Sequence, residues 1–102
     1  MPAAGWTFLT NHARVLLCIA RDPGVRLLDI AQRVGITERS SYGIVQDLAD
    51  AGYIVKEKAG RRNRYRIRAH LPLREPTSRE RTVGDILALL VDGDVPASAD
   101  RP

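Results

Sequence analysis

The residues with the most distinctive chemistry lie in one stretch, between Gly35 and Gly52. Spacing residues about 100° apart, as in an α-helix, gathers arginine, tyrosine, glycine, glutamine and aspartate on the face opposite the apolar one. These residues are Arg39, Tyr42, Gly43, Gln46 and Asp50. Guanidinium, phenol and amide groups are suited to contact with base edges and phosphates. The stretch therefore predicts a helix that touches nucleic acid through its exposed face.

Both ends of this helix are specified by residue type. Thr37 is expected to cap the N-terminus with its side-chain oxygen, and Gly52 suits the left-handed position after the C-terminus. We therefore expect a helix over residues 37–51. Its apolar face would comprise Ser41, Ile44, Val45, Leu48 and Ala51. Gly43 costs this helix about 1 kcal/mol relative to alanine, which either a close approach of DNA or packing inside the protein would explain.

The preceding segment predicts another helix and a tight turn. Leu28–Val34 has apolar residues at helical spacing, Gly35 follows at the turn, and Ile36 can fill the space between the two helices. A helix, a short turn containing glycine and a capped second helix form the order of a helix-turn-helix motif. A compact helical hairpin with another role fits this spacing as well.

The N-terminal residues predict an arm and a first helix. In residues 1–9 we expect Trp6, Phe8 and Leu9 to anchor onto the core. Thr10 is expected to cap a helix over Asn11–Arg21.

Two side chains of that first helix need separate interpretation. His12 falls on the apolar face, so we expect a core histidine rather than a metal ligand. Leu17 points nearly the other way, which makes it a candidate contact with a second subunit.

After Gly52 the apolar spacing changes from the helical period to period 2. This predicts two strands, Tyr53–Lys58 and Arg64–Arg68, joined by turn residues 59–63. Residues 56–68 hold seven basic side chains against one glutamate, and the whole chain has a formal net charge of +4. Such a dense basic hairpin favours a polyanionic partner.

The C-terminal part predicts a connector, a helix and a tail. Residues 69–81 should form an extended connector, residues 82–91 a helix that Thr82 and Asp85 cap, and residues 92–102 a disordered tail. The apolar face of the helix is too wide for an isolated surface helix, so it either covers its own core or pairs with another chain. We expect pairing in a homodimer. The candidate dimerisation residues are Leu17, Val83, Ile86, Leu87 and Leu90.

Composition excludes several classes of function. One cysteine among 102 residues permits no internal disulfide, and the spacing of Cys and His predicts no metal site. His12 and His70 have no neighbouring nucleophile or carboxylate pattern, so we expect neither catalysis nor a cofactor. Without an apolar stretch of about 20 residues or a signal peptide, we expect a cytoplasmic, nucleoid-associated protein that does not enter membranes. The many arginines are a bias often seen in GC-rich genomes, and we expect a bacterial source.

The order of helix, helix-turn-helix and basic hairpin resembles the small bacterial winged helix-turn-helix regulators of the MarR, ArsR and IclR families. The resemblance covers residues 11–68 and rests on three segments. These are Leu28-Leu-Asp-Ile-Ala-Gln-Arg-Val-Gly-Ile-Thr, Leu48-Ala-Asp-Ala-Gly-Tyr-Ile-Val and Gly60-Arg-Arg-Asn-Arg-Tyr-Arg-Ile. It implies a mainly α fold with an antiparallel β-hairpin in residues 10–68, and a homodimer that binds palindromic double-stranded DNA.

The resemblance also implies which residues meet DNA. The second helix of the motif, residues 37–51, would enter the major groove, and the wing, residues 56–68, would touch the backbone or the minor groove. Arg39 could then bind a guanine and Gln46 an adenine. The candidate residues are Thr37, Arg39, Ser40, Tyr42, Gly43 and Gln46 on the helix, and Lys58, Arg61, Arg62, Asn63 and Arg64 on the wing.

The chain also departs from these families. It lacks the long flanking helices of MarR proteins, the effector domain of IclR proteins and the metal-binding cysteines of ArsR proteins, so no sensed ligand is expected. Two other functions remain open: a protein-interaction module, and a non-specific binder of RNA or nucleoid DNA. The basic wing argues against the interaction module, which has no need of so many cations.

Overall fold

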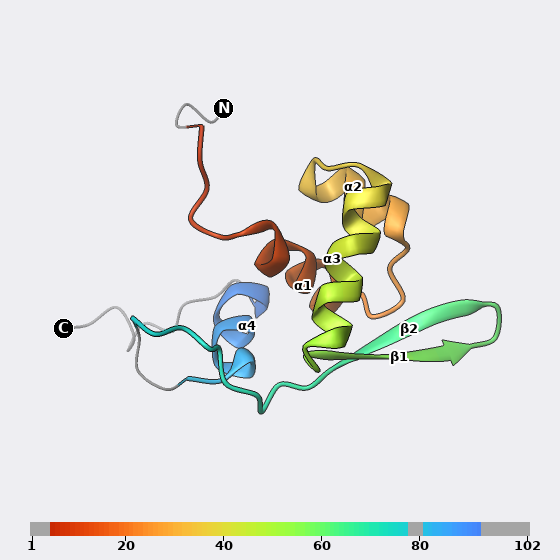
Figure 1. The fold of residues 1–102 in the computed structure, drawn as a ribbon. Coiled ribbons are helices and arrows are strands. Elements are labelled where there is room, and N and C mark those ends of the chain that lie inside the picture. Colours follow the sequence, from red (N-terminus) through yellow and green to blue (C-terminus); the bar gives the residue numbers. More distant parts are fainter. Residues whose placement is uncertain (1–4, 78–80, 93–102) are drawn as a thin grey trace.

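The computed structural model describes residues 5–77 and 81–92, and in these ranges four helices pack beside a two-stranded hairpin (Figure 1). The elements in chain order are α1 (Asn11–Arg21), α2 (Leu27–Val34), α3 (Glu38–Asp50), β1 (Ile54–Ala59), β2 (Arg62–Ile67) and α4 (Val83–Asp92). This order confirms the expected winged helix-turn-helix fold with an added C-terminal helix. None of these helices is long and apolar enough to cross a membrane, as far as the described residues were searched.

Helix α1 begins and ends where the sequence predicts. The Thr10 side chain accepts a hydrogen bond from the Ala13 amide at 3.1 Å, which satisfies one of the unpaired donors of the first turn. The buried face carries Val15 and Ile19, both fully buried, and these two residues lie at the centre of the core.

Helices α2 and α3 form the expected helix-turn-helix. Helix α2 begins at Leu27, one residue earlier than expected, and Gly35 ends it with φ of 84°. This left-handed conformation suits glycine, and it lets the following amide, that of Ile36, bond back to the Ala31 carbonyl at 3.0 Å. The fully buried Ser41 hydroxyl lies 3.1 Å from the Leu27 carbonyl oxygen, so it ties α3 to the start of α2.

The two caps of α3 are also as predicted. Thr37 accepts a hydrogen bond from the Ser40 amide at 2.9 Å. At the other end, Gly52 has φ of 85°, and the Tyr53 amide bonds back to the Leu48 carbonyl. Ala51, expected on the apolar face, is exposed instead, because the helix ends at Asp50 and Ala51 is its C-cap.

The hairpin is longer and its turn tighter than expected. The antiparallel register runs from Ile54 opposite Ile67 to Ala59 opposite Arg62, which leaves two residues in the turn. The first of these, Gly60, has φ of 68°, so glycine permits the sharp reversal that the sequence interpretation spread over five residues. The second strand alternates as period 2 requires: Tyr65 is buried, and Arg64 and Arg66 are exposed.

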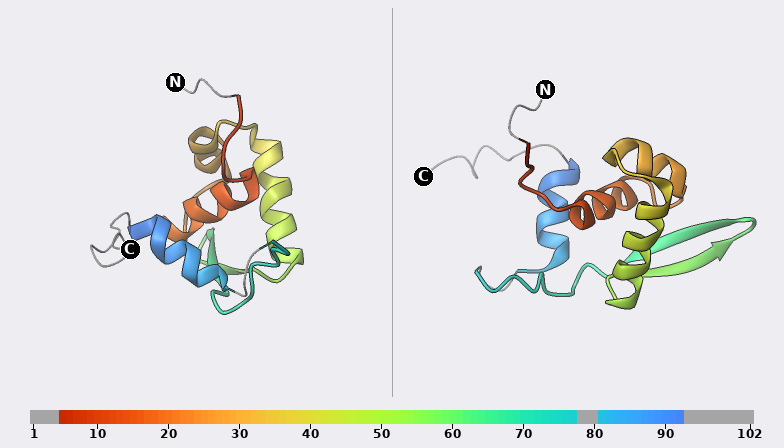
Figure 2. Two further views of the ribbon diagram at one scale, coloured as in Figure 1. Left: turned by 90° about the vertical axis from the view of Figure 1, so that its left-hand side faces the viewer. Right: turned by 45° about the horizontal axis from the view of Figure 1, so that its top comes forward.

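Helix α4 covers the chain's own core. Val83 and Leu87, both expected at a dimer interface, are 2% and 9% exposed and pack with the core residues of α1 (Figure 2). The predicted capping pair is confirmed, because the Asp85 amide donates to Thr82 and the Thr82 amide donates to Asp85. Hydrogen bonding to Thr82, first of all to its backbone amide, lowers the pKa of the Asp85 carboxyl.

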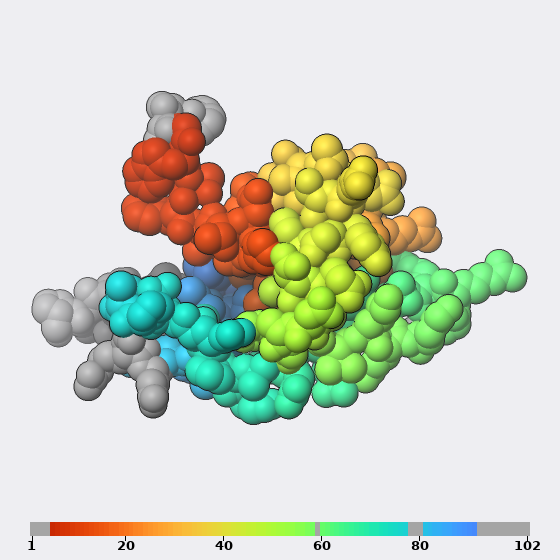
Figure 3. All heavy atoms as spheres, in the orientation of Figure 1, coloured from red at the N-terminus to blue at the C-terminus, as the bar shows by residue number. Residues whose placement is uncertain are grey.

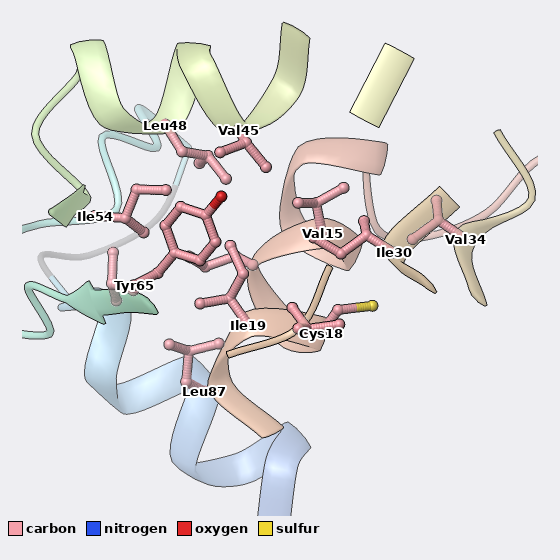
Figure 4. Close-up of a cluster of buried hydrophobic side chains, with 13 residues drawn as sticks. Val15, Cys18, Ile19, Ile30, Val34, Val45, Leu48, Ile54, Tyr65 and Leu87 are labelled. Atoms are coloured by element: carbon pink, nitrogen blue, oxygen red, sulfur yellow. The ribbon is translucent and has the colours of Figure 1, made fainter. Parts of the chain in front are cut away.

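One core joins the helices to the hairpin. Figure 4 shows the Tyr65 ring among Val45 and Leu48 of α3 on one side and Ile19 and Leu87 on the other. Its burial fixes the hairpin against the helix-turn-helix, since an isolated two-stranded hairpin is marginal in water.

The N-terminal arm departs from the sequence prediction. Trp6 is 65% and Phe8 91% exposed, so neither ring anchors onto the core; Leu9 is half-buried. The two rings instead pack against each other edge to face, with centroids 5.1 Å apart. The predicted disordered tail falls almost wholly outside the described residues.

Candidate nucleic-acid interface

The exposed face of α3 is built outward from its buried one. Because Ser41, Val45 and Leu48 are buried, the residues between them on the helix are turned to the surface. In Figure 3 the atoms of α3 form the front of the molecule, with no other described element across them. The sequence-predicted residues Arg39, Tyr42, Gly43 and Gln46 are all exposed there.

The first turn of α3 presents hydroxyl groups. The Thr37 hydroxyl donates to Ser40 Oγ at 2.9 Å while it accepts from the Ser40 amide. The hydrogen of the Ser40 hydroxyl therefore stays available to an outside acceptor. A helix N-terminus with such donors favours an anion, and a DNA phosphate is one.

Gly43 is not explained by packing inside the protein. An added Cβ would meet no other atom within 4 Å, and the backbone is not left-handed. The internal packing reason that the sequence left open is thus removed. The other explanation that the sequence offers, a close approach of DNA to this face of the helix, stays a prediction.

The two acidic residues in the second half of α3 are engaged by neighbours. Asp50 accepts a hydrogen bond from the Gln46 side-chain amide at 3.2 Å, which orients that amide along the helix. Asp47 Oδ2 lies 2.8 Å from His12 Nε2. Both carboxylates stay exposed to solvent, and each is held by one neighbouring side chain.

The His12 contact corrects a sequence prediction. His12 was expected in the core, but its side chain is 49% exposed and reaches from α1 to Asp47 on α3. Helical spacing misses this partner because it lies 35 residues away along the chain. The pair helps to fix the orientation of α3 relative to α1.

The register of the hairpin puts cations on both of its faces. Lys56 pairs with Tyr65 and Lys58 pairs with Asn63, so these side chains share one face. On this face Tyr65 is buried against the core, whereas Lys56, Lys58 and Asn63 are exposed. Lys56, which the list of candidate wing residues omitted, therefore belongs with Lys58; period-2 spacing could have found it.

The opposite face of the hairpin carries three arginines, of which two are engaged. The Arg62 guanidinium donates to the Gly24 carbonyl, in the loop before α2. Arg66 pairs with Glu57 at 3.1 Å, and both side chains are largely exposed, so the pair adds little stability. Arg64 has no ion-pair partner among the described residues.

The described residues were also searched for side chains that could bind a metal ion. No group of three His, Cys, Asp or Glu side chains in the described ranges could hold a metal ion. Burial raises the pKa of the Cys18 thiol, although Arg33, Arg21 and Arg14 act in the opposite direction. Cys18 is buried and packs in the hydrophobic core.

Comparison with known families agrees with this geometry. Residues 9–55 match the family described as winged helix-turn-helix DNA-binding. The match covers α1, α2, α3 and the first two residues of β1, and it ends before the basic part of the hairpin. The search of curated proteins gave no match. Residues 9–55 are thus similar to winged helix-turn-helix DNA-binding domains, and the fold agrees with that similarity. The resemblance to the MarR, ArsR or IclR families in particular stays a prediction.

Proposed function

We propose that this winged helix-turn-helix protein is a sequence-specific regulator of transcription that binds double-stranded DNA as a homodimer. The observation that carries the proposal is the uncovered face of α3, where exposed reading groups surround a glycine that internal packing does not explain. In this proposal α3 enters the major groove, whose width admits one helix. The basic hairpin then lies along the DNA backbone or in the minor groove.

Two side chains on the exposed face of α3 make the base contacts in this proposal. Arg39 binds a guanine edge with two donors, and Gln46 reads an adenine with an amide that Asp50 already orients. Thr37 and Ser40 bind phosphates near the helix N-terminus, where the free amides favour anions. Tyr42, 55% exposed, contacts the groove beside them.

The hairpin supplies affinity that does not depend on sequence. Lys58, Arg61 and Arg64 are exposed, and Asn63 adds a neutral donor near the tip. Each cation that neutralises a phosphate releases condensed counterions, so binding weakens steeply with salt. Arg62 is tied to the Gly24 carbonyl, and it therefore holds the hairpin in place as well as adding charge.

The homodimer requires a surface outside the core. Of the five residues expected at the dimer interface, Leu17, Ile86 and Leu90 are partly exposed and remain in the proposal. A two-fold dimer of this kind reads two half-sites about one helical turn apart. The same proposal places the protein in a bacterial cytoplasm, on the nucleoid.

Selection from a random pool of double-stranded DNA, at two salt concentrations, tests the proposal. Enrichment of a palindrome with half-sites about one turn apart is the expected result. Salt-sensitive binding without enrichment would instead favour the non-specific RNA or nucleoid binder. Absence of binding at low salt would contradict the proposal and favour the protein-interaction module. Arg39→Ala should lose the enrichment at one position of each half-site, whereas Arg81→Ala, which removes an exposed charge before α4, should keep it.

A further inference from the structure

An apolar groove runs between α1 and α4, away from the exposed face of α3. Its walls include Leu16, Leu17, Leu73, Ile86 and Leu90, and its volume is about 180 Å³. Among the described residues that line it there is no Asp, Glu, Lys or Arg. Water in such a groove finds few hydrogen-bond partners, so an apolar occupant is favoured over solvent.

The N-terminal arm carries two exposed aromatic rings, which contact each other. Trp6 and Phe8 stand exposed on the arm, and Leu9, next to them in sequence, already lines the groove. A phenyl ring that is 91% exposed is unusual in a soluble protein, since aromatic rings contribute much of the burial in cores and interfaces. The arm thus offers two rings and the groove offers a site for them.

The conformation of the arm directs the two rings away from the groove of the same chain. The Thr7 hydroxyl donates to the Leu9 carbonyl at 2.7 Å, and the Thr10 cap sets an extended backbone before α1. Figures 1 and 2 show the arm leaving the N-terminal end of α1 and running away from the helices. The rings are therefore presented outward, towards another molecule.

We infer that two copies of this protein exchange arms, the Phe8 ring of each entering the α1–α4 groove of the other while Trp6 covers the rim. This inference rests on the homodimer of the proposed function and names the surface that forms it. The resulting interface is isologous, because each copy contributes the same arm and the same groove. The assembly therefore closes at two molecules.

The sizes agree with one ring in each groove. An apolar cavity of about 150 Å³ is enough to hold benzene, and the groove measures about 180 Å³. Burying four rings removes roughly 600–900 Å² of aromatic surface from water, and the walls that they cover lose a comparable area. The total, roughly 1,200–1,800 Å², lies within the range of stable interfaces, about 1,200–2,000 Å².

The only tryptophan of the chain reports directly on the arm. Sedimentation and Trp6 fluorescence are measured on the full chain over about a hundredfold range of concentration, since dimerisation follows mass action. We expect a dimer whose formation is accompanied by a blue shift of the Trp6 emission. A monomer at every concentration would overturn the inference, and so would a blue shift that does not depend on concentration, because the arm would then occupy the groove of its own chain.

Variants of the arm leave the core untouched, because both rings are exposed. Phe8→Ala is expected to raise the dissociation constant of the dimer by roughly tenfold or more, as for a central aromatic anchor. Leu28→Ala is the matched control, since Leu28 is 51% exposed on α2 and does not line the groove. A dimer that tolerates Phe8→Ala as well as Leu28→Ala would contradict arm exchange.

A disulfide between chains separates exchange from folding back. A chain with Trp6→Cys, which keeps the Phe8 ring, is mixed with a longer, tagged chain that carries Leu90→Cys, and the mixture is oxidised. The expected product joins the tagged to the untagged chain, and Leu28→Cys in place of Leu90→Cys should give little of it. If instead the double variant Trp6→Cys/Leu90→Cys closes only within one chain, the inference is wrong. DNA selection with Phe8→Ala distinguishes the two proposals. If single half-sites are enriched but no dimer forms, sequence-specific DNA binding is supported, and only the arm or the dimer is affected.

Discussion

Helix α3 and the hairpin both belong to the candidate DNA surface, yet their charges are opposite. Helix α3 has three acidic residues and one arginine, Arg39, for a net charge of −2. Residues 56–68 have seven basic residues and one glutamate, for a net charge of +6. Long-range attraction to a polyanion must therefore come from the hairpin, and α3 contributes positioned polar groups. In the proposed function the hairpin therefore supplies affinity and α3 supplies sequence reading.

The two elements also differ in how they are held. Helix α3 has both ends capped and one face in the core, whereas the hairpin extends beyond the helices and is anchored mainly near its base (Figure 1). Fixed side chains suit hydrogen bonds to base edges, which require geometry. A projecting strand pair suits contacts with phosphates, which require charge.

We expect the largest effect on stability from a substitution that breaks the contact between the hairpin and α3. Tyr65→Ala removes the ring that packs against α3, and we expect a loss of about 3–5 kcal/mol in the free energy of unfolding, as for other buried aromatic residues. Urea denaturation measures it. Arg64→Ala, at the exposed neighbouring position, should change stability by less than about 0.5 kcal/mol. Equal, small effects of the two changes would mean that the hairpin does not depend on the core.

Replacing Arg39 tests the proposed role of α3 in reading the DNA sequence. Arg39→Ala should weaken binding to the selected DNA by about 1–3 kcal/mol and relax the preference at one base. Titration with the selected site and with its single-base variants measures both quantities. An equal loss on every sequence would place Arg39 with the hairpin, among the contacts that supply only charge.

Gly43 offers a test in which stability and binding change in opposite directions. Gly43→Ala should raise the free energy of unfolding by about 0.5–1 kcal/mol, because alanine favours the helix and its Cβ meets open space. DNA binding should fall, because the methyl group stands where the DNA approaches.

A second glycine is the matched control. At Gly84 on α4 an added Cβ would lie 3.1 Å from the Ala69 carbonyl oxygen, so Gly84→Ala should destabilise the protein. Unchanged or tighter DNA binding by Gly43→Ala would show that the DNA does not approach α3 at this position.

The smallest effect is expected at the tip of the hairpin. Arg61→Ala should lower the dependence of log affinity on log salt by about 1 and leave the sequence preference nearly unchanged. Arg62→Ala should also lower stability, because its guanidinium binds the Gly24 carbonyl. Affinity is measured across a salt series. An unchanged slope for Arg61→Ala would remove the tip from the interface.

Local chemistry explains which features could be predicted from the sequence. Helix ends depend on groups within a few residues, so the Thr10 and Thr37 caps and the Gly35 and Gly52 terminations were all predictable. The exposure of the reading residues followed from the helical period in the same way. The whole winged order was therefore accessible from short-range patterns.

The features that were missed depend on contacts between distant segments. Hydrophobicity alone placed Trp6 and Phe8 in the core, although no described part of the chain covers them. Likewise, the sequence shows that α4 has an apolar face, but it does not show that Val83 and Leu87 on this face pack on α1. His12 found an acidic partner on another helix, and spacing within one helix cannot reveal such a pair.

Methylation interference on the selected DNA tests the central claim most directly. Guanine N7 lies in the major groove and adenine N3 in the minor groove, so methylation at the two atoms distinguishes which groove is read. The account predicts that methylation of a guanine N7 in each half-site blocks binding, and that Arg39→Ala abolishes this sensitivity. Binding that is unaffected by N7 methylation at every guanine, or blocked by methylation at adenine N3 alone, would contradict the placement of α3 in the major groove.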